Sequence, residues 1–71
     1  MHGSPRLFDV VALLSEAPAY GLVPGQVGTV LEVLDGACEV EFSDDEGRPY
    51  AELAFPSDQL LVLHYRPEQP V

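Results

Sequence analysis

The side chains of this sequence best suited to surface chemistry are carboxylates at corresponding positions of neighbouring β-patterned segments. Alternate residues of a strand share one face of a sheet, so these carboxylates are expected together. The expected surface comprises Glu32, Glu39, Glu41 and Glu52, with Val30 and Tyr50 on the same face. An aromatic ring with carboxylates around it could bind a basic partner protein. The alternative is a solvated sheet face whose acids prevent aggregation.

Catalytic chemistry is not indicated by the histidines or by the carboxylates. His64 follows the last expected strand and His2 lies near the N-terminus, and neither has the supporting residues of a catalytic triad. Outward-facing carboxylates have nothing to shift their pKa values toward acid–base work. The glycine-rich stretch lacks the spacing of nucleotide-binding loops. We therefore expect neither an enzyme nor a cofactor.

Two other residue groups have ordinary structural interpretations. The run Asp44-Asp45-Glu46-Gly47 lacks the alternate ligand spacing of an EF-hand loop, and it is interpreted as a charged tight turn that Arg48 partly balances. Cys38, the single cysteine, falls inward in its expected strand and is interpreted as a small apolar core residue. The sequence therefore predicts no metal site and no disulfide.

The chain is strongly acidic, with a net charge of −9 from 12 acidic and 3 basic side chains in 71 residues. The three bases are arginines, and lysine is absent. Nucleic-acid binding draws most of its affinity from contacts of Lys and Arg with phosphate, so the composition argues against it. The charge would attract a basic protein at low salt, but it would also keep the protein soluble.

A β-hairpin at Asp35-Gly36 positions most of the glutamates. This dipeptide favours a type I′ turn, in which both central residues have positive φ. A two-residue turn predicts the pairs Leu34 with Ala37, Val33 with Cys38, Glu32 with Glu39, Leu31 with Val40 and Val30 with Glu41. The apolar face then holds Leu31, Val33, Cys38, Val40 and Phe42. A slip of one residue would mix the two faces, so burial should fix the register.

Further strands are expected on both sides of this hairpin. The apolar run 7–14 predicts a first strand with Phe8, Val10, Ala12 and Leu14 inward. The remaining strands are predicted at 26–34, 37–43, 50–55 (with Ala51, Leu53 and Phe55 inward) and 60–64. Gly28 is expected to mark a bulge or bend, and Ser57 to cap a short helical turn. The prediction is an all-β fold, a small five-stranded SH3-like barrel with one 3-10 turn before the last strand.

Residues 15–25 contain two prolines and two glycines, which predicts a long loop. The loop is longer than a simple connection requires, so it could present a second surface through Tyr20, Leu22 and Val23. By analogy with SH3-like barrels, Tyr20 and Tyr50 could bracket a ligand groove. Recognition of proline-rich peptides usually needs several grouped aromatics including Trp, which is absent here.

The length of the chain is that of one domain, which we place at residues 7–65 between a flexible lead-in (1–6) and a flexible tail (66–71). No apolar run approaches the roughly 20 residues that cross a bilayer, so no membrane association is expected. A lone thiol without a secretory signal favours the cytoplasm. The absence of Lys, Ile and Asn indicates a GC-rich bacterial genome.

Four segments carry a resemblance to a known group of proteins: 7–14, 21–30, 39–42 and 45–51. Together they resemble an uncharacterised family of short bacterial proteins, a domain of unknown function, over residues 7–64. The resemblance implies an SH3-like barrel and a small partner protein encoded beside another short gene, as in toxin–antitoxin pairs. It implies no catalytic residue. The stretch 25–28 is also similar to the KOW motif of ribosomal and transcription factors, although the basic residues that those proteins use are missing here.

These observations favour a non-enzymatic protein-interaction module. The resemblance makes its most concrete form an antitoxin or immunity-like inhibitor that binds a basic partner protein, such as a toxin encoded nearby. The candidate partner-binding residues are Glu32, Glu39, Glu41, Glu52, Tyr50, Tyr20 and Leu22. Two alternatives stay open: a structural subunit of a homo-oligomer, and a KOW-like protein associated with RNA or ribosomes.

Overall fold

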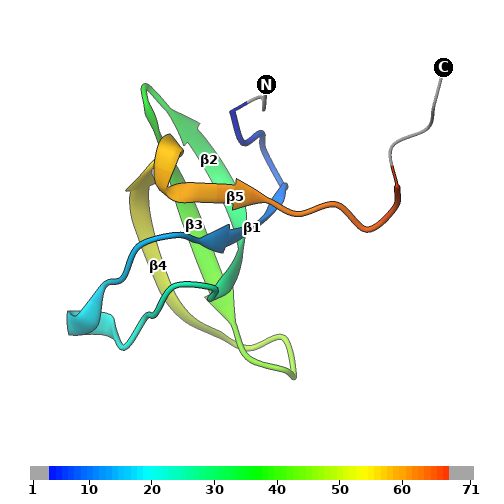
Figure 1. Ribbon diagram of the computed structural model, residues 1–71. Helices are drawn as coiled ribbons and strands as arrows, with labels where there is room; N and C mark the ends of the chain where they lie inside the picture. Colours follow the sequence, from blue (N-terminus) through cyan, green and yellow to red (C-terminus); the bar gives the residue numbers. More distant parts are fainter. Residues whose placement is uncertain (1–3, 68–71) are drawn as a thin grey trace, which may run out of the picture.

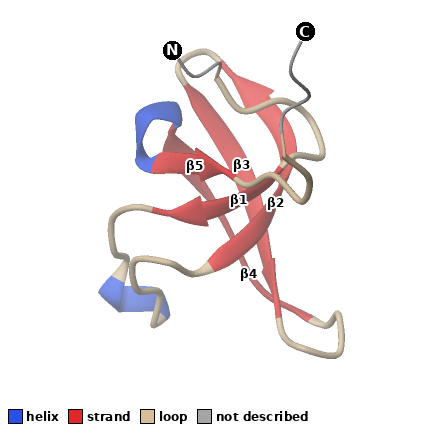
Figure 2. Cartoon of the chain, turned by 45° about the vertical axis from the view of Figure 1, so that its right-hand side comes forward, coloured by secondary structure: helices blue, strands red, loops and turns tan. Residues whose placement is uncertain are grey.

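In the computed structural model of the protein, residues 4–67 of the chain are described. Five antiparallel strands form one sheet in the order β4-β3-β2-β1-β5 (Figures 1 and 2). The elements are β1 (Val10–Leu13), η1 (Pro18–Tyr20), β2 (Val27–Leu34), β3 (Ala37–Ser43), β4 (Pro49–Pro56), η2 (Ser57–Gln59) and β5 (Leu60–Val62). The predicted all-β fold and the 3-10 turn before the last strand are confirmed. The sheet is open, with β4 and β5 as its two edge strands.

Residues 1–3 of the expected lead-in and 68–71 of the expected tail lie outside the described residues.

The β2–β3 hairpin has the predicted register next to its turn. Leu34 pairs with Ala37, Val33 with Cys38 and Glu32 with Glu39. The predicted turn type is wrong, because among residues 4–67 the only non-glycine with positive φ is Phe8, so Asp35 does not have the positive φ of a type I′ turn. Gly36 alone takes the left-handed conformation, with φ of 76°, and this is the position at which glycine is least costly.

A bulge in β2 shifts the register beyond the first three pairs. The irregularity lies between Val30 and Glu32, and Val30 pairs with Val40 instead of the predicted Glu41. An extra residue in one strand reverses its alternation. Val30 therefore faces the core, with no exposed surface, whereas Leu31 is only partly buried. The prediction that Val30 lies on the glutamate face is thus wrong.

The inward face of β1 is the opposite of the predicted one. Val11 and Leu13 are buried, whereas Phe8 is 68% and Leu14 53% exposed. The run 10–14 is apolar throughout, so it has no polar alternation from which to read a face. Asp9, which served to assign the face, lies in a turn before the strand, where its backbone N–H donates to the carbonyl of Arg6.

Gly28 is explained by close packing of β2 against β3. A Cβ atom at this position would lie 2.6 Å from Val40 Cγ1 and 2.8 Å from the carbonyl oxygen of Glu41. The bulge predicted at Gly28 occurs three residues later. Only the absence of a side chain lets β2 and β3 approach here.

The core lies on the inner face of the curved sheet. Its buried members are Val11, Leu13, Leu22, Val30, Cys38, Val40, Phe42, Phe55 and Leu60. The ring of Phe42 meets that of Phe55 edge to face, with centroids 5.9 Å apart. Cys38 is buried as predicted. Ser57 does not cap η2, and its Oγ lies 3.9 Å from the Sγ of Cys38.

Within residues 4–67, no helix has the length and apolar character that a membrane crossing requires.

Candidate functional site

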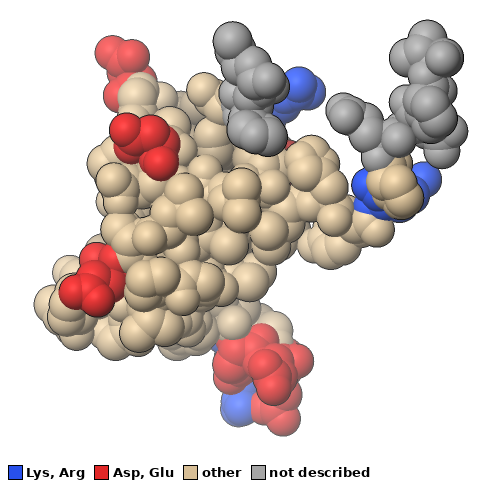
Figure 3. All heavy atoms as spheres, in the orientation of Figure 1, with Lys and Arg blue, Asp and Glu red and all other residues tan. Residues whose placement is uncertain are grey.

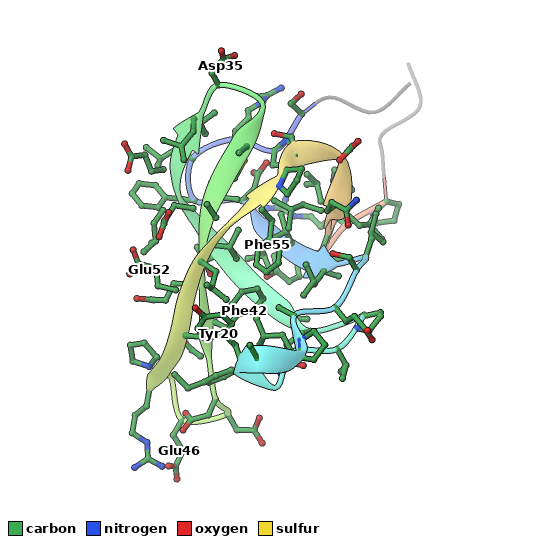
Figure 4. All side chains as sticks on the ribbon, turned by 90° about the vertical axis from the view of Figure 1, so that its left-hand side faces the viewer. Tyr20, Asp35, Phe42, Glu46, Glu52 and Phe55 are labelled. Atoms are coloured by element: carbon green, nitrogen blue, oxygen red, sulfur yellow. The ribbon has the colours of Figure 1, made fainter. Side chains whose placement is uncertain are left out.

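Four glutamates gather on the outer face of β2, β3 and β4, and we call this set the acidic face: Glu32, Glu39, Glu41 and Glu52. Glu32 lies directly opposite Glu39, and Glu41 directly opposite Glu52. None of the four is buried. Figure 4 shows Glu52 on one side of β4 and the core residues Phe42 and Phe55 on the other. The bulge contributes to this separation, because it turns Val30 inward while Glu32 stays outside.

The carboxylates of the acidic face repel one another. Partial burial raises the pKa of Glu39, and a hydrogen bond with Glu52 and the charges of Glu52 and Glu32 raise it further. Each neighbour therefore disfavours the ionised form of Glu39. In the described part of the chain, both ion pairs belong to Arg48, with Asp44 and Glu46 as its partners. No cation from residues 4–67 neutralises the acidic face, so a basic group supplied by another molecule would relieve the repulsion.

The second acidic cluster, in the β3–β4 loop, is satisfied within itself. Asp44 Oδ1 accepts hydrogen bonds from the backbone N–H groups of Glu46 and Arg48, both at 2.9 Å. Its Oδ2 accepts a bond from Arg48 Nε at 3.2 Å. The backbone bond from Arg48 is the main cause that lowers the pKa of Asp44. These bonds support the interpretation of the loop as a charged turn.

Tyr50 does not lie among the glutamates as expected. The pairing of β3 with β4 is irregular between Phe42 and Ser43, and Tyr50 is left without a direct partner there. Its ring centroid is 6.5 Å from that of the fully buried Phe42. Its hydroxyl accepts a hydrogen bond of 2.7 Å from Gln26 Nε2. Tyr50 therefore packs on the core side of the sheet and links β4 to the long loop.

The long loop divides its predicted surface residues between surface and core. Tyr20 in η1 is 59% exposed and Val23 is 56% exposed (Tyr20 is labelled in Figure 4). Leu22 is only 1% exposed and belongs to the core, so its assignment as a binding residue is wrong. An antiparallel bridge between Ala17 and Leu22 closes the loop and directs Leu22 inward.

Sequence reasoning missed the largely uncharged outer surface of β1, β2 and β5. Ala12 pairs with Val27 on one side and with Leu61 on the other, so the three lie in one row across the sheet. Val27 is 48% and Leu61 46% exposed. Figure 3 shows that the side of the molecule over β1 and β5 carries few charged side chains, with carboxylates at its rim. The apolar run 10–14 could have indicated this surface, because a strand without polar residues places apolar side chains on both faces of the sheet.

Cys38 and His64 have different environments in the described part of the chain. Cys38 is buried in the core, and His64 is exposed beyond the end of β5. Among residues 4–67, no three His, Cys, Asp or Glu side chains are arranged to share a metal ion.

Comparison with known protein families identifies the chain at family level. The family model described as a domain of unknown function, DUF4926, matches residues 7–62, which include all five strands. The chain belongs to the DUF4926 family. Comparisons with curated proteins and with solved structures gave no match. The predicted membership of an uncharacterised family is confirmed, and the DUF4926 description assigns no activity.

Proposed function

We propose that this DUF4926 protein is a non-enzymatic interaction module that binds a basic partner protein through its acidic face. The observation that carries the proposal is the set of glutamates on one face with no cation from residues 4–67 beside them; partial burial and the neighbouring carboxylates raise the pKa of Glu39 there. Binding of Lys or Arg side chains would remove like-charge repulsion that the isolated protein retains. Charge complementarity of this kind gives specificity and a fast association rate.

The biological form of the proposal is an antitoxin or immunity-like inhibitor in the cytoplasm, built on an SH3-like barrel. Its partner would be a basic protein encoded nearby, whose active surface the carboxylates would cover. The revised positions of Tyr50 and Leu22 change the expected anchor. Tyr50 is 48% exposed but is turned away from the acidic face, so Tyr20, 59% exposed on η1, is the more exposed of the two candidate tyrosines.

Co-expression with the product of the adjacent gene, followed by affinity purification, tests the proposal. The double variant Glu39→Lys/Glu41→Lys should raise the Kd for the captured partner by at least about tenfold at low salt, which corresponds to about 1.4 kcal/mol. The matched control Glu16→Lys/Asp45→Lys changes the net charge equally but lies outside the acidic face. An equal loss in both variants, or no loss in either, would reject the acidic face as the binding surface.

The second candidate function is that of a subunit of a homo-oligomer. The uncharged row of Ala12, Val27 and Leu61 favours it, because a second acidic chain could approach there without opposing carboxylates. Sedimentation of the isolated protein at micromolar concentration tests this function. A dimer that Leu61→Glu dissociates, and that the equally exposed control Val33→Glu leaves intact, would support it. A monomer throughout would reject it.

A further inference from the structure

The outer edge of β4 is a long strand edge without a partner. β4 is the last strand on its side of the sheet, and no other strand within residues 4–67 pairs with it there. It is eight residues long, whereas the opposite edge strand, β5, has three. Unpaired strand edges present backbone N–H and C=O groups that can pair with another chain.

The hydrogen bonds of the neighbouring strands show which β4 backbone groups are free. The N–H of Val30 donates to the carbonyl of Asp9, and its own carbonyl accepts from Phe8, so Val30 bonds toward β1. Its partner Val40 must therefore bond toward β4, where it is paired with Leu53. Along β3, the backbone N–H and C=O groups of successive residues point alternately toward β4 and toward β2. The hydrogen bond from the Ser57 N–H to the Gly36 carbonyl agrees with this alternation.

It follows that Ala51, Leu53 and Phe55 bond toward β3, and that the backbone groups of Glu52 and Ala54 point away from the sheet. The side chains of Glu52 and Ala54 are exposed on the outer face, whereas Leu53 is partly buried and Phe55 is buried. Glu52 also lies beside Glu39 and opposite Glu41. A carboxylate cluster thus adjoins an edge whose free hydrogen-bonding groups face outward.

β4 has few of the features by which edge strands avoid pairing. Such strands are commonly short or carry lysines, prolines or inward charges. Here the prolines, Pro49 and Pro56, stand at the two ends, and the interior residues that face inward are apolar. An added strand would therefore find an uninterrupted edge from Glu52 to Ala54.

We propose that the β4 edge binds an extended segment of the partner as a sixth, antiparallel strand, with basic and apolar residues alternating in that segment. The inference rests on the proposed function and specifies its partner. Directly opposed residues have side chains on the same face, so the basic residue stands opposite Glu52 and the apolar residues continue the inner row of Leu53 and Phe55. A second copy of this chain fits the edge poorly, because it brings another net charge of −9 and its own Glu52.

The geometry makes a specific demand on the bound segment. Because Glu52 points its N–H and C=O outward, the residue opposite it must point its own N–H toward β4. The basic residues of the segment therefore make the backbone hydrogen bonds, and the N–H groups of the apolar residues point away. Methylation of the basic residues' backbone nitrogens should block binding, while methylation of the apolar residues' nitrogens should be tolerated.

The test uses a capped peptide of alternating lysine and valine with the intact protein at low salt. Binding should slow amide hydrogen exchange of Glu52 and Ala54 at least about tenfold. The exchange rates of the Leu53 and Phe55 amides should stay the same with and without the peptide. The peptide N-methylated at its lysines should lose this effect, and the peptide N-methylated at its valines should retain it. Both methylated peptides carry the same charge, so electrostatic attraction alone cannot separate them.

Protein variants provide a second arm of the test. Ala54→Pro removes an outward N–H that the fold does not use, and proline is tolerated at such edge positions. It should abolish the protection, while the control Ala54→Thr should preserve it. If Ala54→Pro does not fold, the two methylated peptides still decide the question.

The outcomes separate this inference from the proposed function. Equal binding by both methylated peptides, or binding without protection of Glu52 and Ala54, overturns edge addition while leaving the acidic face as a docking surface. Absence of peptide binding also overturns edge addition. The proposed function itself fails if the Glu39→Lys/Glu41→Lys variant captures the native partner as well as the parent protein does, or if the control Glu16→Lys/Asp45→Lys loses capture equally.

Discussion

The pKa of Glu39 on β3 depends on side chains from the two neighbouring strands. Partial burial raises its pKa, and the carboxylates of Glu52 on β4 and Glu32 on β2 raise it further. Asp44 has the opposite environment, because backbone N–H groups and the Arg48 guanidinium surround its oxygens and lower its pKa. The two residues belong to the same acidic strand-loop segment, yet their charges act in opposite directions on stability.

The variant Glu39→Gln should increase the free energy of unfolding near pH 7. A raised folded-state pKa means that ionisation disfavours the folded protein as the pH rises through that pKa. The increase should disappear below about pH 4, the ordinary range of a carboxyl group, where Glu39 is protonated in both states. Urea unfolding at pH 7 and pH 3 measures the difference. A gain of the same size at both pH values would contradict the electrostatic explanation.

The variant Asp44→Asn should lower the free energy of unfolding near pH 7. Its depressed pKa means that the ionised form stabilises the folded state above the unfolded-state pKa and that this stabilisation is lost as the pH falls through the folded-state pKa. The difference from the parent protein should therefore shrink on acidification. The same urea series reports it, and a loss that persists unchanged at pH 3 would assign the effect to the lost hydrogen bonds and not to charge.

At the scale of the elements, β2 is the strand on which the separation of faces depends. Its bulge turns Val30 inward, and Gly28 allows β3 to pack against it. The variant Gly28→Ala should destabilise the protein by about 1–3 kcal/mol, because the new methyl group would overlap the backbone of β3. Thermal unfolding measures the loss.

Gly36 provides the matched comparison for Gly28. It has open space around the position of a Cβ atom but a φ of 76°. Asn tolerates that conformation better than Ala does, so Gly36→Asn should be less harmful than Gly36→Ala. At Gly28 the order should reverse, because the larger side chain meets more of β3. The same order of Ala and Asn at both glycines would contradict the two separate explanations.

The elements that the sequence predicts well are those with a local physical signal. Asp35-Gly36 located the turn, and the alternation of apolar and acidic residues in 37–43 defined both the strand and its faces. The bulge at Leu31 was not predictable in the same way, since Leu31 and Val30 are both apolar and either could face the core. The face of β1 and the position of Leu22 had no polar contrast around them either, and only tertiary packing decides them.

At the scale of the whole molecule, the long loop is anchored to the core through Leu22. Leu22 is only 1% exposed and packs in the apolar core, so Leu22→Ala should cost about 2–5 kcal/mol. Its neighbour Val23 is 56% exposed, and Val23→Ala should stay within about 0.5 kcal/mol of the parent protein. Urea unfolding of both variants distinguishes a structural loop from a freely exposed binding loop. Equal stability of the two variants would show that the loop is not anchored through Leu22.

The complete burial of Cys38 makes the thiol a natural reporter of opening of the sheet. No other cysteine is present in the sequence, so a thiol-reactive dye added to the native protein can modify a single site, and only when β3 separates from its neighbours. The rate of that modification should fall with every stabilising substitution considered above and rise with every destabilising one. One mass-spectrometric time course could therefore rank all these variants without denaturant, under the same conditions in which binding is measured.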